Sequence, residues 1–452
     1  MSNKGFIHLH LHTQYSLLDG AIPFEPLFAR CKKLGMDSVA MTDHGNMFGA
    51  VEFYVKAKGA GIKPIIGIEA YVAPGSRHDK SKSSISDAAH HLVLLAENNA
   101  GYQNLLKLAS IGYTEGFYYR PRIDKEVLAQ FNEGLICSTA CIKGEVTAAV
   151  ASGDMKAARA AAESYLKIFG PERFFIEIQC HKGEDPNVRA GCIELANEMG
   201  IGLVATNDVH FLEADDYEAH NCLTCISTGK LATDPERMVY PPGVYLKSSD
   251  EMREMFPEAP ESCDNTLAIA ARCNVEIDLK TRHAPVYRPP DGSTAEDYLR
   301  KLCYEGAKER YAEITDRVTE RMERELQVIQ SKGFSSYFLI VWDFCNYSRS
   351  NGIPVGARGS GVGTIVGYCL GLCDVDPIKY DLLFERFMDP ARNEMPDIDI
   401  DTCQQHRPDV IGYVRKQYGE VAPIIPFGTM KAQAVIPAIR PVPGVPRSGA
   451  DR

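Results

Sequence analysis

Residue types that bind metal ions recur in the N-terminal half of the sequence, beside short apolar segments. His8, His10 and His12 alternate within FIHLHLHT, and a period of two places all three on one face of a β-strand. Other candidates follow the C-terminal ends of apolar segments, namely Asp43, His44, Glu69, Cys141, Asp208 and His210. Imidazole, carboxylate and thiolate ligands together suit Zn²⁺ or Mn²⁺ better than Ca²⁺. The pattern predicts a cluster that binds one or more divalent metals.

Two further residues fit this cluster less directly. His91 stands at the start of its apolar segment, so a rule based on strand ends does not select it. Asp19 lies in the turn LLDG and is equally compatible with a helix cap. A cluster of several metals can bind the oxygens of a phosphate ester and activate water as the nucleophile. The alternative, unrelated surface histidines and acids, does not account for their repeated position at strand ends.

The elements that must position these residues alternate between strand and helix over residues 1–280. Apolar segments such as GLICST and GLVATNDVH alternate with amphipathic segments such as 156–169. This order is typical of an α/β fold, and seven or more units allow a closed barrel with its active site at the C-terminal strand ends. The Pro-rich stretch HAPVYRPPDGS predicts a domain boundary, with a second domain over residues 281–428.

The composition bounds the class of protein. The chain has 452 residues, 45% hydrophobic and 24% charged, which suggests two or three globular domains. Its 14 cysteines have no framework spacing, and no apolar run is long enough for a signal peptide or membrane helix, so we expect a cytoplasmic protein with reduced thiols. A net charge of -11 argues against nonspecific coating of nucleic acid but allows a local basic groove.

A second candidate site lies in the domain expected over residues 281–428. The Gly-rich stretch IPVGARGSGVGTIVGYCLG allows backbone N–H groups to approach phosphates, and Arg358 offers a fork for phosphate oxygens. Asp397, Asp399 and Asp401 alternate in MPDIDID, so a strand would project their carboxylates from one face. A solvated acidic strand edge is the alternative. Beside a phosphate-type turn, we favour a pair of divalent metals that position a nucleoside triphosphate.

Several motifs carry a resemblance to a known family. HLHLHT, LLDG, TDHGN, IGIE and NDVH resemble the polymerase and histidinol phosphatase (PHP) domain of bacterial C-family replicative DNA polymerases, the polymerase III alpha subunits. The resemblance implies a distorted barrel of seven strand–helix units that holds up to three metals and can act as a 3′–5′ exonuclease. It places the metal ligands at His10, His12, Asp19, His44, Glu69, His91, Cys141, Asp208 and His210. His8 and His90 would then be neighbours that bind no metal.

The second domain carries the same resemblance. SYFLIVWDF, GARGSG, LLFERF and PDIDID resemble the palm of these polymerases, a partial α+β nucleotidyltransferase-like domain. The resemblance implies that Gly359 and Ser360 contact the incoming triphosphate, beside the phosphate fork expected of Arg358, and that Arg386 lies near its phosphates. It also implies that Asp397 and Asp399 are catalytic carboxylates that bind Mg²⁺, whereas Asp401 is not normally counted as one. The implied partners are a DNA primer-template and deoxynucleoside triphosphates, with no membrane.

The sequence departs from the family towards its end. Family members are much longer, and their third catalytic aspartate, fingers, sliding-clamp motif and OB-fold have no counterpart here. Prolines at 437, 441, 443 and 446 interrupt a segment that should be helical, so residues 429–452 are expected to be a truncated, disordered start of the thumb. We expect no primer extension by this chain alone. Contacts with the sliding clamp and other replisome subunits are expected only through the missing regions.

Two other functions remain open on the sequence. A free-standing metal-dependent phosphoesterase of the histidinol phosphatase type, acting on small phosphomonoesters, would use the first domain. It would leave the Gly-rich turn and the PDIDID segment without a role. A scaffold with structural metals is the third possibility, but closed structural zinc sites need about four ligands, which is fewer than the candidates found here.

Overall fold

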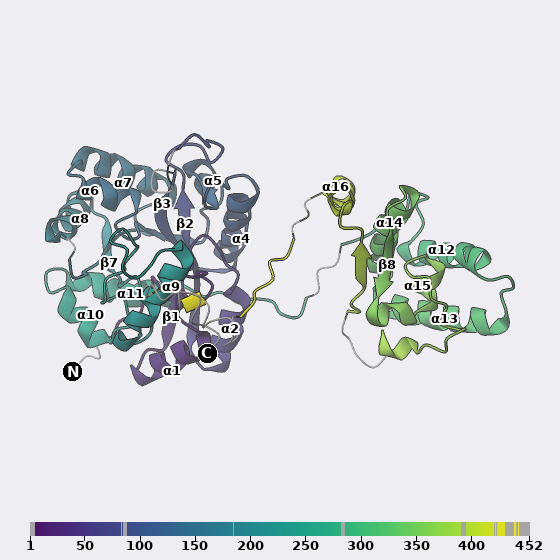
Figure 1. The fold of residues 1–452 in the computed structure, drawn as a ribbon. Coiled ribbons are helices and arrows are strands. Elements are labelled where there is room, and N and C mark those ends of the chain that lie inside the picture. Colours follow the sequence, from purple (N-terminus) through teal and green to yellow (C-terminus); the bar gives the residue numbers. More distant parts are fainter. Residues whose placement is uncertain are drawn as a thin grey trace. The chain divides into compact units, whose positions relative to one another are not determined.

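A computed structural model describes residues 5–82, 84, 88–183, 185–281, 285–389, 395–419, 421, 423–429, 438–439 and 442. These residues form two compact units, one up to Leu279 together with the described residues from Thr429 onward, and one over Lys280–Gly428 (Figure 1). Most of the predicted start of the thumb at 429–452, with its four prolines, lies outside the described residues.

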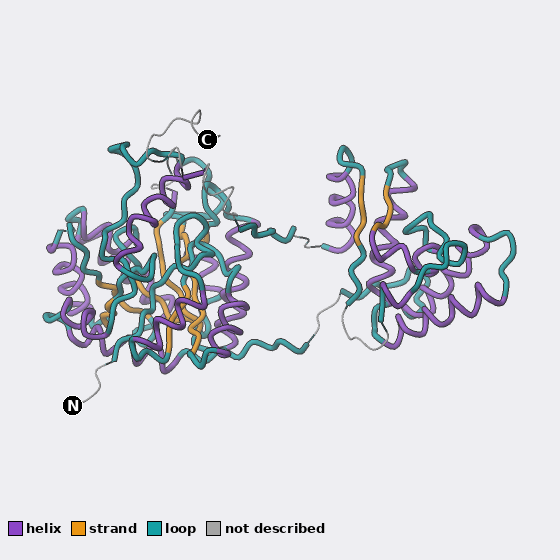
Figure 2. Tube along the Cα trace, turned by 60° about the horizontal axis from the view of Figure 1, so that its bottom comes forward, coloured by secondary structure: helices purple, strands orange, loops and turns teal. Residues whose placement is uncertain are grey.

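The first unit is built on a curled sheet surrounded by helices (Figure 2). In sheet order its strands are β1 (Ser38–Met41), β2 (Lys63–Val72), β3 (His90–Ala96), β5 (Leu135–Ser138), β6 (Phe174–Ile178) and β7 (Gly202–Ala205). The short β4 (Arg122–Ile123) also pairs with β2. All neighbours are parallel except β3, which runs antiparallel to both β2 and β5. Among these strands, β3 therefore runs in the direction opposite to the others.

The N-terminal segment closes this sheet into a barrel. Ala40 N donates to His8 O at 3.0 Å, which joins the segment to β1. On its other side, His12 N donates to Val209 O at 2.8 Å, just beyond β7. The predicted α/β class and distorted β/α barrel are confirmed.

The N-terminal segment is not the regular strand that its alternating histidines predict. Ile7 N donates to the Thr266 hydroxyl at 3.2 Å and Leu11 N to the Thr42 hydroxyl at 2.8 Å. Because these N–H groups bond to side chains, they do not contribute to a backbone ladder, and only an isolated bridge forms at Leu11. The segment is extended but irregular.

The barrel interior changes from apolar to polar along the strands. At one end the inward positions hold Ile65, Val93, Phe175 and Val204, which pack against α11 (Pro260–Arg272). Towards the other end, the inward positions of these strands, or positions just beyond them, hold Glu69, His91, Glu177 and Asp208. These residues lie two positions from the apolar ones on β3 and β6, and four positions from those on β2 and β7. Because inward positions recur at every second residue of a strand, apolar side chains close one end of the barrel. Residue types that bind metals line the other end.

Helices cover the outer face of the barrel. They are α1 (Phe24–Lys33), α2 (Ala50–Gly59), α4 (Asn99–Thr114), α5 (Lys125–Gln130), α6 (Glu145–Ala151), α7 (Met155–Phe169) and α8 (Pro186–Met199). Then follow η1 (Ala214–Asp216), α9 (Tyr217–Thr228) and α10 (Ser249–Met255). Outward strand residues such as Val39, Leu94 and Ile176 pack with these helices in the largest apolar core. All 14 cysteines are free thiols.

The second unit has an α+β arrangement. Its helices are α12 (Ala295–Arg310), α13 (Asp316–Ser331), α14 (Ser335–Ser350), α15 (Ile365–Cys369) and α16 (Arg407–Tyr418), with the turns η2 (Gly359–Gly363) and η3 (Phe384–Arg386). Its two strands, β8 (Val355–Arg358) and β9 (Asp399–Thr402), are antiparallel. No helix in the described ranges is both long and apolar enough to cross a membrane.

A buried carboxylate fixes the Gly-rich turn of the second unit. Glu325 on α13 is fully buried and accepts hydrogen bonds from Thr364 Oγ1 at 2.6 Å and Val366 N at 3.3 Å. Arg321, one turn earlier, donates its Nε to Glu325 at 2.6 Å and its Nη2 to the backbone oxygens of Gly363 and Leu382. Burial raises the pKa of Glu325, and these donors oppose that effect. The ion pair between Arg321 and Glu325 therefore fixes the conformation of the Gly-rich turn.

We expect Glu325→Gln to lower the free energy of unfolding of the second unit by about 3 kcal/mol, because it leaves Arg321, whose side chain is 16% exposed, without its buried charge partner. The only tryptophan of the chain, Trp342, lies on α14, so its fluorescence during urea denaturation reports this unit. Glu320→Gln, at an exposed position of the same helix, is the matched control. Equal denaturation midpoints for the two variants would contradict the assignment.

Candidate functional site

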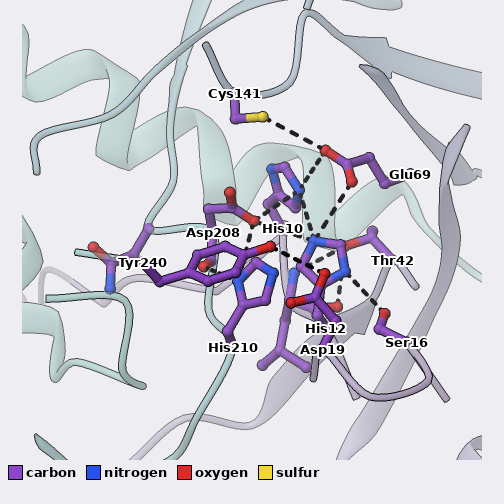
Figure 3. Close-up of polar contacts among 12 residues, drawn as sticks. His10, His12, Ser16, Asp19, Thr42, Glu69, Cys141, Asp208, His210 and Tyr240 are labelled. Atoms are coloured by element: carbon purple, nitrogen blue, oxygen red, sulfur yellow. Dashed lines mark hydrogen bonds and ion pairs between the residues drawn. The ribbon is translucent and has the colours of Figure 1, made fainter. Parts of the chain in front are cut away.

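The structure brings the nine candidate ligands together at the polar end of the barrel. Figure 3 shows His10, His12, Asp19, Glu69, Cys141, Asp208 and His210 among them. His10 and His12 come from the N-terminal segment, and their Nε2 atoms lie 3.2 Å apart. Asp19 lies in the turn after this segment. The other ligands follow β1 (His44), lie on β2 and β3 (Glu69 and His91), or follow β5 and β7 (Cys141, Asp208 and His210). His8 is buried elsewhere, with Nε2 at 2.9 Å from Lys247 O, so the predicted common face of the three histidines is wrong for His8.

The position of His91 follows from the direction of β3. Because β3 is antiparallel to β2, its first residues lie at the same barrel edge as the last residues of the parallel strands. His91 pairs in register with Tyr71, close to the C-terminal end of β2. Its imidazole therefore enters the cluster from the start of a strand.

The ligand atoms form three overlapping groups, within each of which they lie no more than 4.8 Å apart. These groups are His10–His12–Asp208, His12–His44–His210 and His44–Glu69–His91. His12 and His44 each belong to two groups. Each of the three groups could hold a metal ion, and the shared histidines link neighbouring groups.

Two carboxylates lie between the imidazoles. Glu69 places Oε1 at 2.8 Å from His91 Nδ1 and 3.3 Å from His10 Nε2, and its Oε2 at 2.5 Å from His44 Nδ1. Asp208 Oδ1 lies 3.1 Å from His12 Nε2 and 3.2 Å from His10 Nε2. Each carboxylate therefore lies within ion-pair distance of at least two imidazoles of the cluster.

Asp19 and Cys141 lie at the edge of the cluster. Asp19 Oδ2 is 3.1 Å from His44 Nε2 and accepts a hydrogen bond from the Tyr240 hydroxyl at 3.0 Å. Asp19 does not cap α1, whose N-cap residue is Pro23, so the alternative reading of this residue as a helix cap is wrong. Cys141 Sγ lies 3.8 Å from Glu69 Oε1 and 3.7 Å from His91 Nδ1.

Burial and charge shift the pKa values in opposite directions across the cluster. Burial by itself would raise the pKa of Glu69, but His91 and His44 overcome this effect and hold it well below its usual value. Burial lowers the pKa of His12, and the neighbouring His44 and His210 lower it further. For His10, the carboxylates of Asp208 and Glu177 outweigh burial and raise the pKa. The cluster thus holds ionised carboxylates beside at least one neutral imidazole, the forms that bind metals.

The donor set fits divalent metals. Asp19 Oδ1 and His210 Nε2 are buried and have no hydrogen-bond partner within the described part of the chain. Buried polar atoms without partners destabilise a protein by about 1–3 kcal/mol each, so both atoms point to a missing ligand. Imidazole nitrogens, carboxylate oxygens and one thiol are the ligands of Zn²⁺ and Mn²⁺ sites.

An outer layer of side chains orients the ligands, and sequence reasoning did not assign it this role. Glu177 is buried and accepts from His10 Nδ1 at 2.7 Å, which directs His10 Nε2 into the cluster. Asp43 accepts a hydrogen bond from Ser16 Oγ at 2.7 Å, and Ser16 Oγ lies 3.0 Å from His12 Nδ1. A lone carboxylate inside the apolar strand FFIEI was the available signal for Glu177, since such a group needs buried partners.

Backbone strain also gathers at the cluster. Leu18, Ala140 and Asp208 have φ angles of 58°, 58° and 45° without being glycine. The first two precede Asp19 and Cys141, and the third is itself a candidate ligand. Left-handed backbone at such residues costs about 1–3 kcal/mol each and concentrates at functional sites.

The second candidate site lies where β8 meets β9. Arg358 pairs in register with Asp399, its Nη1 lies 3.5 Å from Asp399 Oδ2, and its Nε lies 3.2 Å from Asp401 Oδ1. Gly359 follows with φ 67°, and a Cβ there would be 3.6 Å from Asp399 Oδ2. The structure therefore brings the Gly-rich turn and two of the three carboxylates together.

The remaining predicted residues of this site are less closely placed. Asp397 is exposed and precedes β9, so it is not on the paired strand. Arg386 is exposed on η3, which packs against η2. Ser360 lies in η2, and its side chain is outside the described part of the chain.

Comparison with known proteins gives matches over both units. Residues 8–181 match the family model of the PHP domain, and residues 297–452 match that of the bacterial DNA polymerase III alpha NTPase domain. The chain is 46% identical to DNA polymerase III subunit alpha of Treponema pallidum and 45% identical to that of Borreliella burgdorferi, over 99% and 98% of this chain. It spans 39% of the length of each of these relatives.

Among solved structures, an amidohydrolase from Chromobacterium violaceum with bound sulfate matches with a TM-score of 0.29. The two sequences are 15% identical, and the match covers 45% of this chain and 87% of that chain.

We expect Glu177→Gln to weaken binding of Zn²⁺ or Mn²⁺ about 10- to 100-fold, because His10 loses the carboxylate that fixes its orientation. Competition with a chromophoric chelator measures the affinity. Glu172→Gln, in the turn before β6, is the control because its carboxylate lies away from the cluster. Unchanged affinity in Glu177→Gln would show that His10 is held by other contacts.

Proposed function

We propose that the first unit of the chain, which belongs to the family of bacterial DNA polymerase III alpha subunits, is a metal-dependent 3′–5′ exonuclease. The observation that carries the proposal is the convergence of seven ligand-type side chains into three overlapping groups at one barrel end, with Asp19 and Cys141 beside them. A structural zinc site needs about four ligands and has no need of shared ones.

The ligand cluster would hold Zn²⁺ or Mn²⁺. Bound there, such metals would stabilise the charge on a phosphodiester and lower the pKa of water so that it can attack phosphorus. The protein side chains would keep this site in order. Glu177 holds His10, Ser16 contacts His12, and Tyr240 donates to Asp19, so each ligand keeps one orientation before substrate arrives.

The second unit supports a separate proposal. In DNA-directed DNA polymerisation, the Gly359–Ser360 turn with Arg358 and Arg386 would bind the phosphates of a deoxynucleoside triphosphate. Asp397 and Asp399 would bind Mg²⁺, which stabilises the attacking and leaving oxygens. The pairing of Arg358 with Asp399, directly before Gly359, supports this arrangement. The partners would be a primer-template and deoxynucleoside triphosphates, with replisome subunits bound by other parts of the whole protein.

We expect His10→Ala and Asp208→Ala to abolish both bound metal and shortening of single-stranded DNA, since each removes a ligand of the His10–His12–Asp208 group. Elemental analysis gives the metal content, and a 5′-labelled oligonucleotide with Mn²⁺, Zn²⁺ or Mg²⁺ gives the nuclease activity. His78→Ala, an exposed histidine, is the control.

The same assay separates the candidate functions. Stepwise shortening of the oligonucleotide supports the exonuclease. Release of phosphate from histidinol phosphate without shortening would favour the small-molecule phosphatase, and bound metal without either activity would favour a structural role.

We expect Asp399→Asn to remove the Mg²⁺-dependent part of dATP binding, measured by isothermal titration calorimetry, because the carboxylate beside Gly359 is lost. Asp401→Asn should keep most of that binding, although Asp401 also pairs with Arg358. Equal losses in the two variants would show that the acidic strand acts only through overall charge.

A further inference from the structure

A cavity of about 490 Å³ adjoins the ligand cluster in the first unit. It lies between α6, α8 and the ends of β5 and β6, and these two helices pack side by side (Figure 1). We call it the side cavity, and the lining residues used below are Ala140, Ile142, Thr147, Ala151, Gln179 and Val188. Its volume is in the range of pockets that hold a small organic ligand.

The side cavity adjoins a second cavity at the ligand cluster. A second cavity of about 210 Å³ is lined by the ligands His44, His91 and Asp208. Both cavities are lined by Cys141, Ile142, Gln179 and His181. A phosphate bound on the ligand cluster would therefore have the side cavity as its immediate neighbour.

The walls of the side cavity suit a flat, mostly apolar group with a polar edge. Ala140, Ile142 and Val188 provide apolar surface. Thr147 is only 7% exposed, and its hydroxyl has the thiol of Cys192, a weak partner, beside it. A buried hydroxyl without a strong partner is suited to bond with a ligand. A nucleobase combines apolar faces with hydrogen-bonding edges.

We propose that the side cavity binds the terminal nucleoside of a single-stranded DNA 3′ end while the scissile phosphate lies on the ligand cluster. This inference rests on the proposed exonuclease function and adds where the substrate is recognised. A water oxygen forms a bond to phosphorus, and the bond from phosphorus to the 3′ oxygen of the preceding nucleotide breaks. That oxygen takes up a proton, and the terminal residue leaves as a nucleoside 5′-monophosphate whose base occupies the side cavity.

The neighbouring base of the strand would stay outside the side cavity, because the strand continues from the other side of the scissile phosphate. The terminal base must therefore leave its stack, which costs a few kcal/mol and is easiest for an unpaired end. The side cavity offers apolar contacts that offset this cost. Recognition would then favour frayed or mismatched ends over paired ones.

The test compares two matched variants of the full chain. Ala151 lies at an exposed position lining the side cavity, so Ala151→Trp fills the cavity with little disturbance of the core. Ala160 is exposed on α7 and is not among the lining residues, so Ala160→Trp is the control. Substrates are a 5′-labelled oligothymidylate, the same strand with an abasic 3′-terminal residue, and methyl 4-nitrophenyl phosphate, whose methyl group needs no cavity.

We expect Ala151→Trp to raise KM for the base-carrying end about tenfold or more, the effect of losing one base contact. Its activity on the abasic end and on methyl 4-nitrophenyl phosphate, and its metal content, should match Ala160→Trp. Wild-type kinetics on the base-carrying end, or equal losses on all three substrates, would overturn the role of the cavity. If the unmodified chain hydrolyses the small diester but not DNA, the exonuclease proposal fails, and this inference with it.

A measurement on the unmodified chain covers the case in which Ala151→Trp does not fold. Thymidine 5′-monophosphate should inhibit hydrolysis of methyl 4-nitrophenyl phosphate about tenfold more strongly than 2-deoxyribose 5-phosphate, because only the former carries a base. Equal inhibition by the two phosphates would exclude a base-binding cavity.

Discussion

The first unit depends on one electrostatic constraint, which is the burial of several carboxylates and imidazoles within contact of one another. Glu69 shows it most directly, because this buried carboxylate lies against His10, His44 and His91. Opposite charges lower its pKa, but the imidazoles also repel one another when protonated. Such a set is stable in one protonation pattern or with bound cations. The strained backbone at Ala140 and Asp208 is tolerated because the rest of the barrel is firmly packed.

In the barrel, the inward side chains change from apolar to metal-binding types along each strand. Val93 and His91 occupy the same face of β3, as Phe175 and Glu177 do on β6, so a single period of two supplies both the apolar seal and the polar end. The antiparallel β3 delivers a ligand from its first residues rather than its last. The irregular N-terminal segment closes the ring while leaving His10 and His12 free to face inward, at the expense of regular ladder bonds.

Much of the fold and of the candidate site could be predicted, because only a few residue types bind metals and the C-terminal ends of parallel strands meet at one edge of a sheet. His44, Glu69 and Asp208 follow from these two rules, and the α/β barrel follows from the alternation of elements. His91 required the direction of β3, which no local pattern contains. The separation of His8 from His10 depends on Thr266 and Lys247, more than 200 positions away, so local period alone could not reveal it. The outer carboxylate Glu177 is recognisable only by its burial.

The second unit also places carboxylates close together, but these are not buried as those of the first unit are. Its carboxylates Asp399 and Asp401 lie at the surface, where solvent screens their repulsion, and Arg358 from the paired strand neutralises part of their charge. An exposed pair of this kind is weak and can exchange the arginine for another cation at little cost. The firmly held part is instead the turn, because the buried Glu325 fixes Thr364 and Val366 behind it. For the proposed triphosphate site, a rigid turn beside replaceable charges would let the ligand and its metals enter together without rearrangement of the backbone.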